Sequence, residues 1–126
     1  MIRGLGIDLV EMSRVAAAYQ RFGDRFARKV LTPEELAWLP RVTAPARFIA
    51  MRFAVKEACS KALGTGFRQG VAPRQIGVVQ ERSGKPNLVL HGNAQDHARR
   101  MGISGSHVSM TDEGGYAAAV VVLESD

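Results

Sequence analysis

The chain lacks several features that define whole classes of protein. Its 126 residues include a single cysteine, which excludes an internal disulfide framework and indicates a reducing compartment. No apolar run approaches the length that spans a membrane, and no charged-then-apolar signal opens the chain. Walker A and dinucleotide-binding glycine motifs are also missing. We therefore expect one cytoplasmic domain, residues 1–126, without a membrane span.

Acidic residues are in the minority, with 12 Asp and Glu against 17 Lys and Arg and a formal net charge of +5. A basic surface attracts nucleic acid, anionic lipid, phosphorylated molecules or acidic proteins, although it also serves solubility alone. Interleaved surface aromatics and recognisable nucleic-acid-binding motifs are absent. A nucleic-acid partner is therefore not expected, and a basic nucleic-acid-binding domain is kept only as a minor alternative.

The elements that are present alternate between strands and helices. Ser13 is a suitable N-cap for a helix that ends at Gly23. A capping box over 32–35 starts a short helix, and Pro45 opens a long central helix. The expected strands are 1–10, 75–81, 87–91, 106–111 and 116–123, and the expected helices are 14–22, 24–30, 33–39, 45–63 and 93–101. This order predicts an α+β domain with a mainly antiparallel sheet packed against the long central helix.

The first strand alternates with period two, which predicts one face in the core. Leu5, Ile7 and Leu9 point to one side, and Asp8 points to the other. Two glycines share the face of Asp8 and leave room for another group to approach the backbone. Asp8 is either part of a site or simply an acid near a strand end.

The central helix is apolar over most of its surface, yet it contains Arg52, Lys56, Glu57 and Lys61. Buried charges need a partner, a ligand or a metal. Glu57 and Lys61, four residues apart, form either an ordinary surface ion pair or the metal and phosphate ends of one site. In the second case Asp8 would supply the other carboxylate, although spacing alone does not bring it to the helix.

Two further groups attract attention. Arg14, Arg21 and Arg25 recur at spacings of seven and four, which suits either docking to an acidic helix or a solvated face. The turn over 82–86 has a basic tip that could hold a phosphate or a nucleobase. The three histidines lack metal-ligand spacing with Cys59, so a structural zinc site is not expected.

Three sequence blocks together resemble the holo-acyl-carrier-protein synthases, the small bacterial class of 4′-phosphopantetheinyl transferases. The first is GLGIDLVE at 4–11 with Arg14. The second and most specific is RFAVKEACSKALGTG at 52–66. The third joins GKP at 84–86 to HVSMT at 107–111 and the strand that starts at Tyr116. These blocks span essentially the whole chain in the family's order, so the resemblance implies the family's fold.

The resemblance implies that coenzyme A donates its phosphopantetheine arm to a serine of apo-acyl carrier protein and leaves as adenosine 3′,5′-bisphosphate. It implies Mg²⁺ held by Asp8 and Glu57, with Lys61 beside the pyrophosphate as the third catalytic residue. It also implies a carrier-protein surface at Arg14, Arg21 and Arg25, and a homotrimer with shared active sites. The implied coenzyme A contacts are Arg52, Lys61, Gly64, Gly66, Gly84, Lys85, Pro86, His107 and Thr111.

One position departs from the family pattern. Many relatives have a histidine after the Ser-x-Thr of the third block, where this chain has Asp112. The proton acceptor is therefore Asp112, Glu57 through a metal-bound water, or water itself. A module that binds carrier protein without catalysis is the second alternative function, although it would not need Asp8, Glu57 and Lys61.

Overall fold

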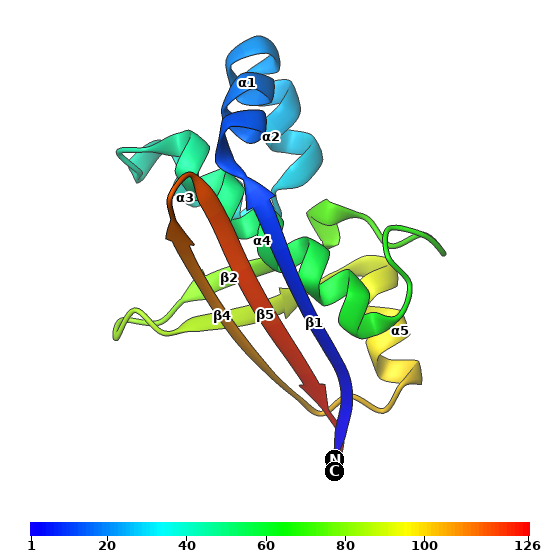
Figure 1. Cartoon of the computed structure of the whole chain (residues 1–126). Coiled ribbons are helices and arrows are strands. Elements are labelled where there is room, and N and C mark those ends of the chain that lie inside the picture. Colours follow the sequence, from blue (N-terminus) through cyan, green and yellow to red (C-terminus); the bar gives the residue numbers. More distant parts are fainter.

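The computed structural model describes residues 1–126 as an α+β domain in which a long helix lies across an antiparallel sheet (Figure 1). Strand β5 is central, between β1 and β4, and the hairpin β2–β3 forms a separate two-stranded sheet. The predicted antiparallel sheet is thus divided in two. The strands are β1 (Ile2–Glu11), β2 (Ile76–Gln80), β3 (Pro86–Leu90), β4 (Gly105–Glu113) and β5 (Tyr116–Glu124). The helices are α1 (Met12–Phe22), α2 (Asp24–Val30), α3 (Pro33–Trp38), α4 (Pro45–Leu63) and α5 (Gly92–Arg100), with short 3₁₀ turns η1 (Leu39–Arg41) and η2 (Pro73–Gln75).

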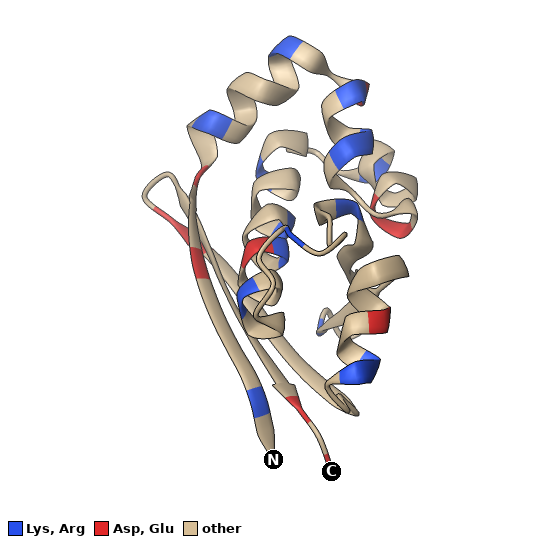
Figure 2. Ribbon diagram, turned by 90° about the vertical axis from the view of Figure 1, so that its right-hand side faces the viewer, with Lys and Arg blue, Asp and Glu red and all other residues tan.

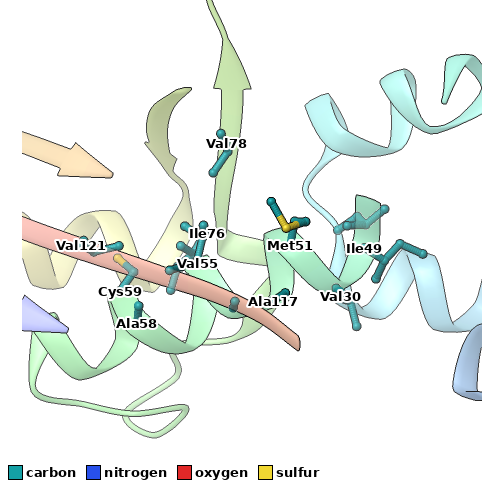
Figure 3. Close-up of a cluster of buried hydrophobic side chains, with 14 of the residues drawn as sticks. Val30, Ile49, Met51, Val55, Ala58, Cys59, Ile76, Val78, Ala117 and Val121 are labelled. Carbon is teal, nitrogen blue, oxygen red and sulfur yellow. The ribbon is translucent and has the colours of Figure 1, made fainter. Parts of the chain in front are cut away.

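The core is built around α4 (Figure 3). Ile49, Val55 and Cys59 are fully buried on this helix, and the inward-facing side chains of β5 meet it. This explains why the helix is apolar around so much of its circumference. None of the helices combines the length and the apolar character that crossing a membrane requires.

The first strand shows its apolar side chains to the outside. Leu5, Ile7 and Leu9 are 66%, 68% and 64% exposed, so the face with the apolar pattern is not the core face. The glycine face lies against α4 instead, where a Cβ on Gly4 or Gly6 would overlap a helix carbonyl oxygen. The predicted close approach to the strand backbone is therefore made by α4.

The predicted helix starts are partly confirmed. Thr32 and Glu35 form the expected capping box, with reciprocal hydrogen bonds of 3.2 and 3.0 Å. The prediction for α1 was wrong at its start, because the helix begins at Met12 and Ser13 caps no backbone amide. The Ser13 hydroxyl donates instead to the Glu11 carboxylate at 3.3 Å.

Candidate functional site

The inner face of β1 places Asp8 beside α4. The Lys61 ammonium donates to Asp8 Oδ1 at 2.9 Å and to the Ile7 carbonyl oxygen at 3.1 Å. The Asp8 side chain is only 16% exposed, whereas that of Lys61 is 53% exposed. The ordinary ion pair between Glu57 and Lys61 that the helix spacing allowed does not form, because Lys61 turns to the strand.

Glu57 and Asp8 line the same hollow, of about 460 Å³, between β1, α1, α2 and α4. Burial raises the pKa of the Glu57 carboxyl, and the nearby Asp8 carboxylate raises it further, while Lys61 acts in the opposite direction. Sequence spacing could not show that Asp8 and Glu57 meet, and the structure brings them together. Their mutual repulsion favours a cation between them.

The donor set fits Mg²⁺. No third His, Cys, Asp or Glu joins these two carboxylates in a group that could hold a metal. Two oxygen ligands from the protein are few for calcium or zinc, but Mg²⁺ commonly takes one or two carboxylates and completes its shell with water and phosphate oxygens.

The glycine-rich exit of α4 leaves open space near Lys61. Gly64 and Gly66 have φ angles of +79° and +57°, which side chains rarely adopt, and a Cβ on either would meet no other atom. The amides of Thr65 and Gly66 both donate to the Ser60 carbonyl oxygen, at 3.2 and 3.1 Å. This ending fixes the loop while leaving its outer side accessible.

Arg52 lies on a different side of α4. Five residues separate it from Glu57, which corresponds to about 140° around the helix axis. Arg52 is 7% exposed, its guanidinium carbon lies 3.9 Å from the centre of the Phe48 ring, and its Nε has no hydrogen-bond partner. It borders a cavity of about 160 Å³ together with Trp38 and Val78.

The remaining predicted coenzyme A contacts also lie away from Asp8. Gly84, Lys85 and Pro86 form the tip of the β2–β3 hairpin, where Gly84 has a φ of +89°. On β4, His107 and Thr111 point to the outer face of the sheet, opposite α4. His107 Nε2 lies 3.1 Å from Glu124 Oε1, and Thr111 borders a shallow hollow beside Ile7. One chain therefore does not unite these residues with Asp8 and Glu57.

The three predicted docking arginines lie around α1 and the start of α2, the basic end of the molecule in Figure 2. Arg14 borders the hollow that contains Asp8. Gly23 ends α1 between Arg21 and Arg25, as predicted. Arg21 and Arg25 nevertheless converge on the exposed Phe22 ring, with their guanidinium carbons 5.1 and 5.9 Å from its centre.

Two charged pairs were missed by reasoning from the sequence. Lys56, fully buried, donates to Glu35 Oε1 at 2.6 Å and to the Ile76 carbonyl oxygen, while Glu35 Oε2 accepts from the Val78 amide at 3.0 Å. Burial lowers the pKa of Lys56, with the Glu35 carboxylate opposing that effect. The pair joins α3, α4 and β2. The sequence did show Lys56 as a charge on an apolar helix, but it did not reveal the partner, because the capping box already explained Glu35.

The second missed pair joins Arg47 to Asp112. Arg47 Nε and a terminal nitrogen donate to the two carboxylate oxygens at 3.0 and 2.8 Å, across 65 residues of sequence. Hydrogen bonding to Arg47 lowers the pKa of Asp112. Both carboxylate oxygens of Asp112, a candidate proton acceptor, therefore already accept hydrogen bonds from Arg47.

Comparison with known proteins identifies close relatives along the whole chain. Residues 4–121 match the 4′-phosphopantetheinyl transferase superfamily. A holo-acyl-carrier-protein synthase from Desulfovibrio desulfuricans is 52% identical over 125 residues, covering 99% of both chains. The crystal structure of the Neisseria meningitidis holo-acyl-carrier-protein synthase has a TM-score of 0.91 at 41% identity and covers 99% of this chain and 100% of that one. The Helicobacter pylori synthase, solved in complex with coenzyme A, has a TM-score of 0.81 at 30% identity, with coverages of 95% and 99%.

Proposed function

The chain belongs to the holo-acyl-carrier-protein synthases of the 4′-phosphopantetheinyl transferase superfamily, and we propose that it transfers 4′-phosphopantetheine from coenzyme A to a serine of apo-acyl carrier protein. Adenosine 3′,5′-bisphosphate is then the leaving group. The observation that carries the proposal is the meeting of Asp8, Glu57 and Lys61 beside one hollow that Arg14 also borders. That hollow is where carrier protein and phosphate would meet.

Asp8 and Glu57 are the residues that would hold Mg²⁺, which supplies charge neutralisation to a transferring phosphoryl group. Lys61 neutralises charge on the leaving phosphate, and its half-exposed ammonium is free to reach that group once Asp8 has another partner. Gly64 and Gly66 allow the pyrophosphate to approach the backbone. Phosphoryl transfer depends mainly on such positioning and charge stabilisation.

The proton acceptor for the serine hydroxyl is better sought near Glu57 than at Asp112. The Arg47 guanidinium occupies both oxygens of Asp112 and lowers its pKa, which weakens it as a base. Glu57 forms no ion pair within the chain, so its carboxylate is open to a metal ion and to a water that such an ion would activate.

We further propose a homotrimer with shared active sites. The outer face of β1 exposes Leu5, Ile7 and Leu9, an apolar surface that a second copy would cover. Arg52, the 84–86 turn, His107 and Thr111 lie away from Asp8 in one chain. If these residues and the site at Asp8 and Glu57 bind the same coenzyme A molecule, the two sets of residues must come from neighbouring subunits.

Sharing can be tested by mixing two impaired variants. Glu57→Gln removes a metal ligand from one group, and His107→Ala removes a contact from the other. Coexpressed chains would form some sites with both groups intact, so activity should exceed that of either parent. Equal or lower activity would contradict shared sites, and light scattering would separately report whether a trimer exists.

The function is tested by incubating the protein with coenzyme A, Mg²⁺ and apo-acyl carrier protein, followed by mass spectrometry of the carrier. We expect a mass gain of one phosphopantetheine, its loss with a chelator, and recovery with Mg²⁺. Glu57→Gln should remain folded and lose the metal-dependent turnover. An unmodified carrier that still binds would favour the non-catalytic carrier-binding module instead.

The location proposed for this reaction is the cytoplasm. The only cysteine, Cys59, is a buried free thiol, and burial raises its pKa to about 12, so it has no disulfide role that would call for an oxidising compartment.

A further inference from the structure

A second basic surface lies on α2, outside the stripe of Arg14, Arg21 and Arg25. Arg25, Arg28 and Lys29 from α2 line a hollow of about 430 Å³ together with Arg74 from η2. No carboxylate borders this hollow. We call Arg28, Lys29 and Arg74 the α2–η2 patch, and Arg25 is the residue that it shares with the stripe.

The cations of the patch have no acidic partner in the protein. The six ion pairs within the chain all involve other residues, and Asp24, one turn before Arg28 on α2, does not pair with it. Arg25 forms no ion pair either, and its guanidinium lies over the Phe22 ring. Gathering unpaired like charges around one hollow raises the free energy of the folded chain, and an acidic partner would relieve that repulsion.

Helix α2 stands between this hollow and the one that contains Asp8 and Glu57. Phe26 lines the Asp8 hollow, whereas its neighbour Arg25 lines the basic one. A partner that lies over α1 and α2 to reach Asp8 is therefore already in contact with the helix that carries the patch.

The usual size of a specific protein–protein interface indicates how much of this surface a bound partner would cover. Stable complexes bury about 800 Å² on each partner through roughly 20–30 residues, which is more than three arginines and a phenylalanine supply. Along α2, Lys29 is only about 6 Å beyond Arg25, since a helix rises about 1.5 Å per residue. A footprint of ordinary size that includes Arg25 thus reaches the patch.

From this geometry we propose that the α2–η2 patch is a second docking region for acyl carrier protein, in which Arg28, Lys29 and Arg74 contact acidic side chains of the carrier beyond the segment that Arg14, Arg21 and Arg25 bind. The inference rests on the proposed function. Its role is in capture and orientation of the carrier, and it contributes nothing to coenzyme A binding.

The test is the double charge reversal Arg28→Glu/Arg74→Glu. Its matched control is Arg99→Glu/Arg100→Glu on α5, which changes the net charge equally at exposed positions near the other end of the molecule (Figure 1). Circular dichroism and thermal melting of both variants establish that they are folded.

Kinetics should separate the two variants. Because two exposed ion pairs with the carrier would be replaced by like-charge contacts, the patch variant should raise the KM for carrier protein roughly tenfold at low salt. Its KM for coenzyme A should be unchanged, and added salt should reduce the difference from wild type. The control should stay near the wild-type values.

Binding of fluorescently labelled apo-carrier gives an independent readout, and labelled duplex DNA serves as the competing probe. Equal effects of the patch variant and the control on carrier binding would overturn the inference. So would tight duplex binding that requires the patch while carrier binding does not. If the wild-type protein leaves the carrier unmodified, the proposed function itself has failed. If the wild-type protein modifies the carrier but Arg28→Glu/Arg74→Glu changes neither the carrier KM nor carrier binding, only this inference has failed.

Discussion

The Lys61 ammonium lies 2.9 Å from Asp8 Oδ1, so in the chain by itself a cation of the protein occupies one lone pair of a predicted metal ligand. Lys61→Met should therefore bind Mn²⁺ or Mg²⁺ more tightly in the absence of coenzyme A, by roughly fivefold, because a like charge is removed and Asp8 is released. Turnover should nevertheless fall, because the leaving phosphate loses its cation. Titration calorimetry and a kcat measurement report the two effects, with Arg100→Met on α5 as a control for general charge loss. Weaker metal binding in Lys61→Met would show that the lysine supports the metal site instead.

The raised pKa of Glu57 predicts a specific dependence on pH. Its carboxyl should titrate above the ordinary value of 4.5 in the metal-free protein, as followed by the carbon chemical shift. Asp8→Asn should lower that midpoint because it removes a neighbouring negative charge. Since the folded pKa is above the unfolded one, ionisation of Glu57 destabilises the metal-free fold as pH rises through this range. A midpoint at or below 4.5 would contradict the geometry.

The ion pair between Arg47 and Asp112 predicts that Asp112 is not the proton acceptor. Removing a general base costs about 10²–10⁴ in rate. Asp112→Asn should therefore lower kcat by less than about tenfold, well below the loss expected for a general base. The midpoint of the acid limb of the pH–rate profile should be the same in this variant as in the wild type. A larger loss, or a limb that moves with this substitution, would return Asp112 to the catalytic group.

The glycines of β1 should not tolerate a methyl group. A Cβ on Gly6 would overlap the Ala58 carbonyl oxygen, and backbone cannot move aside as a flexible side chain can. We expect Gly6→Ala to cost about 3 kcal/mol in urea unfolding, at the upper end for overpacked cores. Gly105→Ala is the matched strand control, because its new Cβ would meet atoms of the flexible Glu124 side chain, the nearest 3.0 Å away, and no backbone atom. Similar losses in both variants would refute a specific contact.

The buried pair of Lys56 and Glu35 should make single substitutions more damaging than a double one. Lys56→Met leaves an unpaired carboxylate in the core and should cost about 3–5 kcal/mol. Adding Glu35→Gln removes that uncompensated charge, so the double variant should recover part of the loss. Chemical denaturation measures both. A single substitution that costs less than about 1 kcal/mol would mean that the pair has little structural role.

Local signals predicted most of the fold. Gly23, Pro45 and the Thr32 capping box act through nearby backbone, so they marked helix ends correctly. The division of the sheet was not predictable in the same way, because strand pairing joins segments far apart in sequence. The exposed face of β1 was obscured for a related reason. Alternation shows that Ile7 and Asp8 point in opposite directions, but it does not show which side meets a helix.

The candidate site divides along similar lines. Glu57 and Lys61 were found because charges on an apolar helix conflict with burial, and Asp8 was found because acids are depleted in strands. Their meeting required the tertiary structure. The Arg47–Asp112 pair left no local trace at all.

The contact between β1 and α4 also has a consequence for how the sheet is assembled. Sliding β1 by one residue against β5 would exchange its faces, turning Asp8 outward and bringing Ile7 under the helix. The backbone hydrogen bonds between β1 and β5 could also form in that shifted register, and the shift would bury the apolar side chains of β1. Packing against α4 excludes the shifted register, because β1 can approach the helix so closely only with Gly6 against the Ala58 carbonyl oxygen. Gly4 and Gly6 therefore fix the register of β1 against β5. The same register places the Asp8 carboxylate beside α4 when the strand packs against the helix.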